Sequence, residues 1–520
     1  MSTWKNKLFF GDNLRILREH VKDESVDLIY LDPPFNSSAN YNVIFREQSG
    51  EQSAAQIIAF EDTWHWGQDS EATYYELVNT APDDLVKLMQ ALRDFLGEND
   101  MMAYLTMMSP RLIELHRVLK PTGSIYLHCD TTAGAYLRIM MDAIFGLRCF
   151  RNEIIWSYRR WPSKSKAYQT MHDVILFYAK TPGGPGTFNI EYEPNSPSYE
   201  KRFGGKTQML DPETKSRKIT LDEDSKGLPR RDVWEISIIA GSSKERLGYP
   251  TQKPEALLER IIKTSSNEGD IVLDPFCGCG TSITVAERLH RRWIGIDITH
   301  LAVSLIKNRL YDSFGSELSP YEVIGDPKDL ASAEALALVD RYQFQWWALS
   351  LVDARPGQDK KKGKDAGVDG YIYFFDDNSG KAKKVLIQVK SGNVKSGDIR
   401  DLKGVLDREQ SPIGAFITLK PATKDMKKEA VSAGYYESPH FGNYPKLQIL
   451  TIEEILDGAK LQYPQMGAAT FRRAERQSKS KTEQAGLFAG QGEAKQSRLP
   501  GRDFSNEPLL DEIEDEGGSG

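Results

Sequence analysis

Short apolar runs rich in β-branched residues alternate with amphipathic helical stretches through residues 1–312. This alternation is typical of a parallel sheet whose strands are connected by crossover helices. The pattern predicts four strands most clearly: Val26–Leu31, Ser124–His128, Ile271–Leu273 and Trp293–Ile296. Between about residues 150 and 250 the alternation fails in a stretch rich in Arg, Lys, Trp, Tyr and Gly. We interpret that stretch as an inserted, loop-rich and partly β segment.

Each of the four predicted strands is followed, directly or after a short turn, by an aspartate. These residues are Asp32, Asp130, Asp274 and Asp297. Ligands of open α/β sheets bind at the carboxyl ends of the strands, so this edge of the sheet is the expected functional site.

A second unit of alternating elements occupies residues 325–465. A helix over 331–349 precedes a basic Gly/Lys loop, and the predicted strands are Tyr371–Phe375, Lys384–Val389, Ile413–Leu419 and Leu447–Thr451. Beyond about residue 466 the chain is rich in Gln, Ser, Lys, Gly and Glu, which predicts a disordered tail. We therefore expect an α/β domain at 1–315 with its insertion at 150–250, a linker at 316–328, a smaller α/β domain at 329–465 and a tail at 466–520.

Composition narrows the class of protein further. With 520 residues, 40% of them hydrophobic, the chain can form two or three folded domains. No stretch approaches the ~18 uninterrupted apolar residues of a membrane span, and the first residues lack a signal-peptide pattern. Four cysteines cannot form a disulfide framework, so we expect a cytoplasmic protein that does not enter a membrane. The net charge of −7 does not argue against nucleic acid, because an acidic run at 511–516 accounts for most of it and basic clusters lie elsewhere.

The segment Asp32-Pro33-Pro34-Phe35 directly follows the first of these strands. Two prolines fix φ and remove two N–H donors, so the turn is stiff and its carbonyl groups point in set directions. An exocyclic amine of a nucleobase is a poor nucleophile, because its lone pair is delocalised into the ring. If the Asp32 carboxylate and the Pro33 carbonyl accept its two N–H groups, the lone pair is directed toward a methyl donor, and Phe35 stacks on the extruded base. On its own, the segment is also compatible with a proline-rich turn and an N-capping aspartate.

A second motif, DPFCGCGT at residues 274–281, connects a predicted strand to a helix. Gly278 and Gly280 allow a ligand to approach the backbone closely, as in nucleotide-binding turns, although the spacing is not that of a dinucleotide-binding motif. Asp297 ends the next strand, where an acidic residue binds ribose hydroxyls in this topology. Metal binding by the two cysteines of the motif is a weaker alternative, because no cluster of Cys or His accompanies them.

Together these motifs resemble the DNA amino-methyltransferases that use S-adenosylmethionine. The matching segments are GDNL (Gly11–Leu14), LIYLDPPF (Leu28–Phe35), GYPTQKP (Gly248–Pro254), LDPFCGCGTS (Leu273–Ser282) and WIGIDI (Trp293–Ile298). Because DPPF precedes DPFCGCGT, the order is similar to that of the β group of the family, in which the intervening segment is the target-recognition domain. The resemblance implies a Rossmann-like S-adenosylmethionine-dependent methyltransferase fold over about residues 1–312. DPPF resembles the adenine-N6 enzymes more than the cytosine-N4 enzymes.

The resemblance also implies roles for individual residues. The residues that would hold the target base and its amine are Asp32, Pro33, Pro34 and Phe35. The residues that would bind the cofactor are Asp12 near its adenine, Asp297 at the ribose, Lys253 near the pocket, and Asp274, Phe276, Gly278, Gly280 and Thr281 on the methionine and adenosine side. Direct methyl transfer to nitrogen needs neither a metal nor a covalent enzyme intermediate, so we expect Cys129 and Cys149 to be buried core residues.

In the inserted segment, aromatic and basic residues alternate. The residues expected to contact DNA phosphates, or guanine in the case of the arginines, are Arg159, Arg160, Lys164 and Lys166. The strand-like run that contains Ile175, Phe177 and Tyr178 is expected to belong to the core.

In the second unit, an acid and two further polar residues are predicted to converge on one pair of strands. Asp369 starts a strand, and Gln388 and Lys390 lie two apart on the next strand, so their side chains point to the same face. Such a set suits Mg²⁺-assisted phosphodiester cleavage, in which oxygen ligands hold the metal and a lysine supports the developing charge. Glu334, on the preceding helix, is a weaker candidate for a further ligand. The same alternation is also ordinary for an amphipathic strand.

The order of helix, hairpin, helix and strand in this unit resembles the restriction-endonuclease-like PD-(D/E)xK fold, specifically its Mrr-like branch. The matching segments are GVDG (Gly367–Gly370) and IQVKSG (Ile387–Gly392). Asp365 is a competing candidate for the acid. Gln388 replaces the usual second acid and lowers the negative charge of the site, so a nuclease that has lost cleavage and only binds DNA is the alternative.

The sequence therefore predicts a site-specific DNA methyltransferase that methylates adenine N6 and carries a fused Mg²⁺-dependent endonuclease domain, for restriction-modification or defence. One alternative is an orphan methyltransferase, acting on adenine N6 or cytosine N4, whose C-terminal domain only binds DNA or a partner. Another is a non-catalytic subunit of a defence complex. The expected cofactors are S-adenosylmethionine and Mg²⁺. The expected partner is double-stranded DNA, with a homodimer or restriction or defence subunits as further options.

Overall fold

The computed structural model describes residues 4–34, 65–161, 166–184, 186–210, 217–247, 249, 251–356, 368–377 and 382–464. The predicted tail at 466–520 lies outside these ranges, as do Phe35 and Lys164 of the predicted sites and the competing Asp365. Within the described ranges, no helix is long and apolar enough to cross a bilayer.

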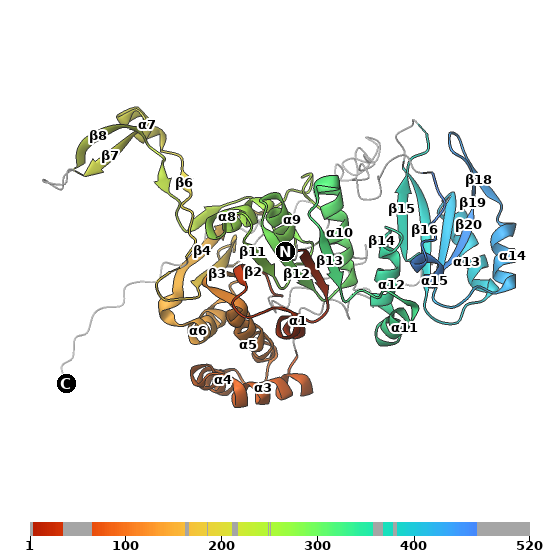
Figure 1. Ribbon diagram of the computed structural model, residues 1–520, viewed down its shortest axis with the longest axis horizontal. Coiled ribbons are helices and arrows are strands. Elements are labelled where there is room, and N and C mark those ends of the chain that lie inside the picture. The colour runs from red at the N-terminus through yellow and green to blue at the C-terminus, as the bar shows by residue number, and fades with distance from the viewer. Residues whose placement is uncertain are drawn as a thin grey trace, which may run out of the picture. The chain divides into compact units, whose positions relative to one another are not determined.

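A nine-stranded sheet forms the centre of the first domain (Figure 1). Its strands, in spatial order, are β10 (Val233–Glu235), β4 (Phe150–Ser157), β5 (His172–Ala179), β3 (Leu119–Cys129), β2 (Val26–Leu31), β11 (Ile271–Asp274), β12 (Arg292–Asp297), β1 (Asn6–Phe10) and β13 (Tyr321–Ile324). Strands β3, β2, β11, β12, β1 and β13 run parallel to one another, whereas β5 runs antiparallel to both β3 and β4. All four strands predicted most clearly lie side by side in this sheet.

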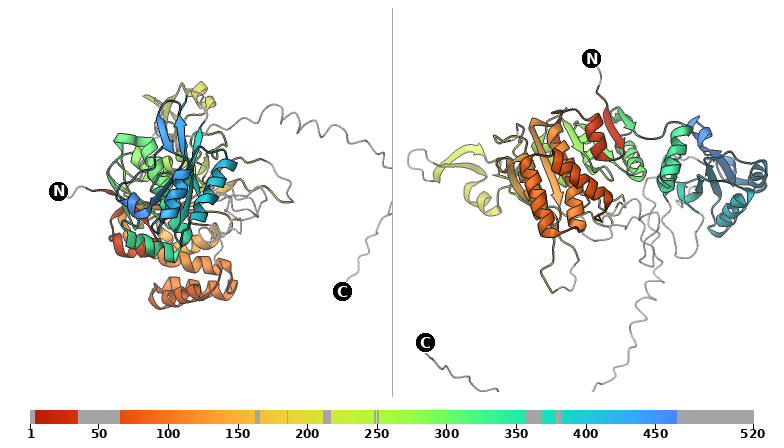
Figure 2. Two further views of the ribbon diagram at one scale, coloured as in Figure 1. Left: turned by 90° about the vertical axis from the view of Figure 1, so that its right-hand side faces the viewer. Right: turned by 90° about the horizontal axis from the view of Figure 1, so that it is seen from below.

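Helices cover both faces of the sheet, as the further views in Figure 2 also show. One face packs against α1 (Asn13–His20), α5 (Asp100–Val118) and α6 (Gly134–Phe145), and α3 (Gln68–Thr80) and α4 (Asp83–Leu96) pack in turn on α5 and α6. The other packs against α8 (Glu255–Ser265), α9 (Thr281–Arg288) and α10 (His300–Phe314). Along β2, Ile29 and Leu31 point to the first face and Leu28 and Tyr30 to the second. Burial on both faces explains why the strand reads as an uninterrupted apolar run.

Part of the segment at 150–250 belongs to the sheet. Strands β4, β5 and β10 extend it beyond β3, and the predicted core residues Ile175, Phe177 and Tyr178 are buried there. The segment leaves the sheet between β5 and β10, in an arm made of β6 (Tyr192–Glu193), α7 (Pro197–Phe203), β7 (Lys206–Leu210), β8 (Arg217–Asp224) and β9 (Leu228–Pro229) (Figure 1). Cys129 and Cys149 lie in the core, as expected for cysteines without a chemical role.

The second domain has a five-stranded sheet of its own. Its strands, in spatial order, are β14 (Arg355–Pro356), β15 (Gly370–Phe374), β16 (Lys383–Lys390), β17 (Ile413–Thr418) and β20 (Leu447–Thr451). Beside the sheet lie α11 (Leu330–Val339), α12 (Arg341–Ser350), α13 (Ser396–Arg408), α14 (Lys424–Ser432), α15 (Ile452–Leu456) and a hairpin of β18 (Tyr435–Ser438) and β19 (Gly442–Pro445). The single helix predicted over 331–349 is wrong. Asp340 interrupts it, because its side chain accepts hydrogen bonds from the backbone N–H groups of Tyr342 and Gln343 and starts α12 there.

The position of Gly280, between β11 and α9, does not accommodate a larger residue. Its φ is +73°, and a Cβ there would lie 2.7 Å from Cγ1 of Ile306 on α10. Gly269 has a φ of +82° but no atom within 4 Å of the corresponding position. We expect Gly269→Ala to cost about 1 kcal/mol for its backbone conformation alone, and Gly280→Ala to cost about 1–3 kcal/mol more through overpacking.

Urea unfolding of the two variants, followed by circular dichroism, measures this difference. Equal destabilisation by both would show that packing against α10 does not require the glycine.

Candidate active site

Parallel register brings four aspartates to one edge of the first sheet. Leu273 of β11 pairs with Ile29 of β2, Asp274 pairs with Gly295 of β12, and Phe10 of β1 pairs with Asp297. Asp32, Asp274, Asp297 and Asp12 therefore all lie at carboxyl ends of adjacent strands. Asp130, at the end of β3, instead accepts hydrogen bonds from the backbone N–H groups of Thr132 and Ala133 and caps the turn that leads into α6.

Asp32 is held by a lysine from a distant part of the chain. Its Oδ2 forms an ion pair with Nζ of Lys253, and the side chains are 15% and 11% exposed. The other oxygen, Oδ1, is buried and has no hydrogen-bond partner among the described residues. The neighbouring Pro33 is buried and Pro34 half-buried, so the turn is fixed on both sides. The site thus presents one desolvated carboxylate oxygen whose direction is set by a buried ion pair.

A histidine not predicted from the sequence lies next to this oxygen. Nδ1 of His128 is 3.9 Å from Oδ1 of Asp32 and 3.0 Å from the Tyr30 hydroxyl, and its Nε2 is 3.2 Å from Oδ2 of Asp173. The ring is fully buried. Burial alone would raise the pKa of Asp173, but hydrogen bonds from His128 and Tyr158 and the nearby charges outweigh it, and the pKa is lowered. The only signal in the sequence was a histidine at the end of a predicted strand, because the pairing of β3 with β5 is not visible there.

The glycine loop is closed by its own side chains. Asp274 accepts hydrogen bonds from the Ser282 hydroxyl and from the N–H of Phe276, at 3.0 Å for the latter. Gly278, with a φ of +49°, donates its N–H to Oδ2 of Asp297 at 2.9 Å. Burial raises the pKa of Asp274 to about 7. Asp274 therefore helps to hold the loop in shape, and Asp297 lies beside the loop.

Asp297 and Asp12 both already accept hydrogen bonds from neighbouring protein groups. Oδ1 of Asp297 accepts from both the N–H and the hydroxyl of Thr299 at 2.9 Å, and burial raises the pKa of Asp297 to about 6. Asp12 caps α1 by accepting from the N–H of Arg15 at 3.0 Å, and its other oxygen pairs with Arg111 at 2.6 Å. Since a carboxylate oxygen has two lone pairs, both groups can accept a further hydrogen bond from a ligand.

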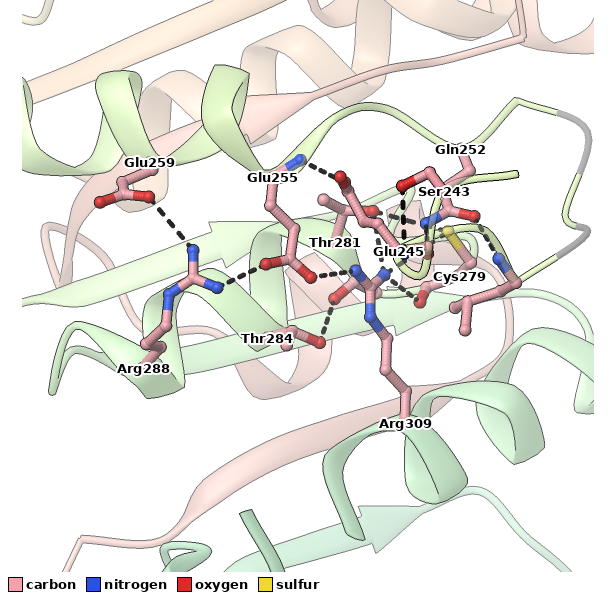
Figure 3. A network of polar contacts seen from close by, with 12 residues as sticks. Ser243, Glu245, Gln252, Glu255, Glu259, Cys279, Thr281, Thr284, Arg288 and Arg309 are labelled. Carbon is pink, nitrogen blue, oxygen red and sulfur yellow. Dashed lines mark hydrogen bonds and ion pairs between the residues drawn. The ribbon is translucent and has the colours of Figure 1, made fainter. Parts of the chain in front are cut away.

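A buried arginine ties the glycine loop to the segment that carries Lys253 (Figure 3). Arg309 of α10 donates to the Cys279 carbonyl and the Thr281 hydroxyl at 3.0 Å each, and to Glu255 at 2.8 Å. Glu255 starts α8, two residues after Lys253, and its N–H donates to Glu245 at 2.6 Å. This network explains how residues on two distant segments stay in register, and Arg309 was not predicted from the sequence.

Gln252 connects two parts of the segment that carries Lys253. The Gln252 side chain donates to the Glu245 carbonyl at 2.7 Å and accepts from the N–H of Leu247 at 2.8 Å.

Burial raises the pKa of Cys277 and Cys279, and no cluster of His, Cys, Asp or Glu suited to a metal ion is found among the described residues.

The described part of the basic cluster lies on the connection between β4 and β5. Arg159, Arg160 and Lys166 are exposed. The guanidinium of Arg160 lies 4.8 Å from the centre of the Tyr158 ring and donates to the Tyr158 hydroxyl at 3.2 Å. Because β4 is parallel to β3 through the antiparallel β5, this connection emerges at the same edge of the sheet as Asp32.

In the second domain, Asp369, Gln388 and Lys390 share one face of the sheet. Oδ2 of Asp369 accepts from the N–H of Val389 at 2.7 Å, and Oε1 of Gln388 is buried without a hydrogen-bond partner among the described residues. Glu334 is not brought to them. Its helix, α11, packs with the cluster on the opposite face, and its carboxylate pairs with Lys420 at 3.2 Å.

The profile of the DNA methylase family of N6/N4 type matches residues 26–308, more than half of the chain. The chain belongs to this family. The Type II methyltransferase M.HpaI of Haemophilus parainfluenzae is 36% identical over 211 residues, 41% of this chain and 60% of that protein. The DNA adenine methyltransferase YhdJ of Escherichia coli K12 is 28% identical over 304 residues, 58% of this chain and 82% of that protein. The chain covers less than two thirds of the length of M.HpaI.

Residues 342–457 match a second family, described as NACHT-associated inactive Restriction Endonuclease 1. This supports a restriction-endonuclease-like second domain, although the Mrr-like branch predicted from the sequence is not the one matched. Among solved structures, the cytosine-N4-specific PvuII DNA methyltransferase aligns at a TM-score of 0.36 with 17% identity, over 61% of this chain and 90% of that one. The M1.HpyAVI–SAM complex aligns at 0.31 with 17% identity, over 58% and 99%.

The residues at the sheet edge fit S-adenosylmethionine, the cofactor expected for this family. The glycine loop connects β11 to α9, and the Asp297 carboxylate beside it can accept hydrogen bonds from a ribose diol. We expect affinity for S-adenosylmethionine to fall as the pH drops through the raised pKa of Asp297, about 6, because the protonated carboxyl accepts fewer hydrogen bonds. If only the ionised form binds, affinity at pH 5 should be about tenfold weaker than at pH 8.

Isothermal titration calorimetry between pH 5 and 8 tests this dependence. Asp297→Asn is the matched control and should bind weakly at every pH. A wild-type affinity that does not change with pH, or a variant that keeps the wild-type pH dependence, would remove Asp297 from the ribose site.

Proposed function

We propose that the chain is an S-adenosylmethionine-dependent DNA methyltransferase that acts on the exocyclic amine of adenine, at N6. The observation that carries the proposal is the Asp32 carboxylate. One of its oxygens is bound by Lys253, and the other is buried without a partner among the residues that the structure describes, at the edge that also holds the glycine loop. A buried, unpaired carboxylate oxygen is costly, and an N–H donor from a base would satisfy it.

At this edge, Asp32 and Pro33 would act on the amine, and Asp297 and the glycine loop would hold the cofactor. Oδ1 of Asp32 and the carbonyl of Pro33 accept the two N–H groups of the extruded base, and the nitrogen lone pair is directed out of the ring plane. S-adenosylmethionine supplies the methyl group, so that the N–C bond forms as the C–S bond breaks and its electron pair passes to sulfur. Lys253 pairs with the far oxygen of the carboxylate and orients it.

The choice of adenine rests on DPPF and is supported by the 28% identity to an adenine methyltransferase of E. coli. Cytosine N4 is the competing target, since the same two acceptors suit its amine. Sequencing of DNA methylated by the enzyme would identify both the modified base and the recognition sequence.

For the second domain we propose binding of DNA or of a partner without cleavage. The matching family is described as inactive, and Gln388 occupies the position of an acid, which leaves Asp369 as the one carboxylate of the set. Mg²⁺-dependent cleavage by Asp369, Gln388 and Lys390 is the second candidate. It is favoured by their common face and by the buried, unpartnered Oε1 of Gln388.

Asp32→Asn should reduce methyl transfer to DNA by about 10²-fold or more, because the neutral amide accepts the amine weakly. Affinity for S-adenosylmethionine should stay within about twofold of the wild type, since Asp32 is assigned to the base. Transfer of a tritiated methyl group and calorimetry measure the two quantities.

Asp27→Asn is the matched control for this variant. Asp27 lies at the other end of β2, is also 15% exposed, and pairs with Lys120. It should lose stability but keep methyl transfer. Loss of cofactor binding in Asp32→Asn would reverse the assignment of the two loops.

Supercoiled plasmid incubated with Mg²⁺ and the purified chain should stay intact, and Lys390→Ala should give the same result. Lys384→Ala, at the exposed start of β16, controls for a lost surface charge. Nicking by the wild type that Lys390→Ala abolishes and Lys384→Ala keeps would establish the nuclease instead.

A further inference from the structure

A connected set of polar side chains runs from the surface to Asp32. Arg160 donates to the Tyr158 hydroxyl at 3.2 Å, and that hydroxyl donates to Oδ1 of Asp173 at 2.9 Å. Oδ2 of Asp173 is 3.2 Å from Nε2 of His128, whose Nδ1 faces Oδ1 of Asp32 at 3.9 Å. Four strands contribute to the set, so it belongs to the sheet and not to one flexible loop.

Polar and charged groups from several elements face the His128 ring. Asp173 of β5 and Asp32 after β2 face its two nitrogens, and Tyr30 of β2 is within hydrogen-bond distance of Nδ1. The Trp156 ring of β4 contacts it edge to face, with 5.5 Å between the ring centres. Lys253 brings a cation to this part of the site, and it is paired with the far oxygen of Asp32.

Methylation of an amine creates a proton that must leave. The nitrogen gains a carbon and carries a positive charge until one N–H bond breaks and its electron pair returns to nitrogen. Asp32 is in contact with that N–H in the proposed function, and its other oxygen is already paired with Lys253. A free imidazole is more basic than a free carboxylate by about 2.5 pH units, so a histidine behind the carboxylate is the better resting place for the proton.

We propose that His128, held by Asp173, accepts through Asp32 the proton released when the target amine is methylated. The inference rests on the proposed function. The N–H proton passes to Oδ1 of Asp32 and from there to Nδ1 of His128, and the imidazolium is stabilised by Asp173. The 3.9 Å gap exceeds a hydrogen bond by about 1 Å, so a small rotation of the Asp32 carboxylate is part of the step.

The proton can also pass from this set of side chains to solvent. Asp173 is 18% exposed, so water can take the proton directly from the His128–Asp173 pair. Tyr158 donates to Asp173 and the Arg160 guanidinium cannot accept a proton, so these two residues hold Asp173 in place and do not relay the proton. A purely structural histidine would need only its bonds to Tyr30 and Asp173. Oδ1 of Asp32 faces the ring at 3.9 Å and has no hydrogen-bond partner among the described residues.

Single-turnover methylation at pH 5.5–9 tests the proposal. The wild-type rate constant should be level at high pH and fall at low pH, where His128 is already protonated. In Asp173→Asn the fall should move to lower pH by about one unit, because the imidazolium loses its counter-charge, and the level rate should drop about tenfold. In His128→Asn the rate should drop about 10²-fold and the fall at low pH should disappear.

Two controls separate this role from a loss of folding. His116→Asn removes a half-buried histidine of α5 outside the set and should keep the wild-type rate and pH profile. All variants should bind S-adenosylmethionine within about twofold of the wild type. The ¹³Cε1 resonance of His128, identified among the eight histidines by its loss in His128→Asn, should titrate in the wild type and do so at lower pH in Asp173→Asn.

Wild-type rates and pH profiles in both variants would overturn the proposal. So would equal loss of rate at every pH without a moved profile, since that is the signature of a structural role. A wild type that transfers no methyl group would overturn the proposed function as well, and the two failures are therefore distinguishable.

Discussion

The ion pair between Asp32 and Lys253 joins residues 221 positions apart, and the geometry of the candidate active site depends on it. Both side chains are largely removed from water, so the pair is worth little for stability and costs desolvation. The ion pair instead fixes the orientation of the Asp32 carboxylate. One carboxylate oxygen is occupied and the other is aimed at the site, while the parallel register of β2, β11 and β12 fixes how far that oxygen lies from the glycine loop.

Two buried networks keep this arrangement in place from opposite sides. Arg309 connects the Cys279 carbonyl and Thr281 to Glu255, and so couples the loop after β11 to the segment that supplies Lys253. On the other side, His128 and Asp173 connect β3 and β5 behind Asp32. Low local dielectric strengthens each contact and makes each unpaired partner costly, so the networks specify one geometry.

The sequence predicted the acidic edge well, because a parallel sheet places every strand-terminal aspartate on the same side. It predicted neither Arg309 nor Asp173, since both act through pairings of elements that are distant in the chain. The break at Asp340 was missed although an N-capping residue was visible, because the apolar periodicity continues across it. The resemblance assigns Asp274 to the cofactor, and its contacts with Ser282 and Phe276, which the sequence did not predict, also close the loop.

The central claim is that the Asp32 edge methylates adenine N6. Single-molecule sequencing of DNA from cells that express the wild type or Asp32→Asn tests it most directly. The account predicts a defined sequence motif that carries N6-methyladenine with the wild type and no mark with the variant. N4-methylcytosine at the motif would contradict the choice of base, and an unmodified genome with the wild type would contradict the claim itself.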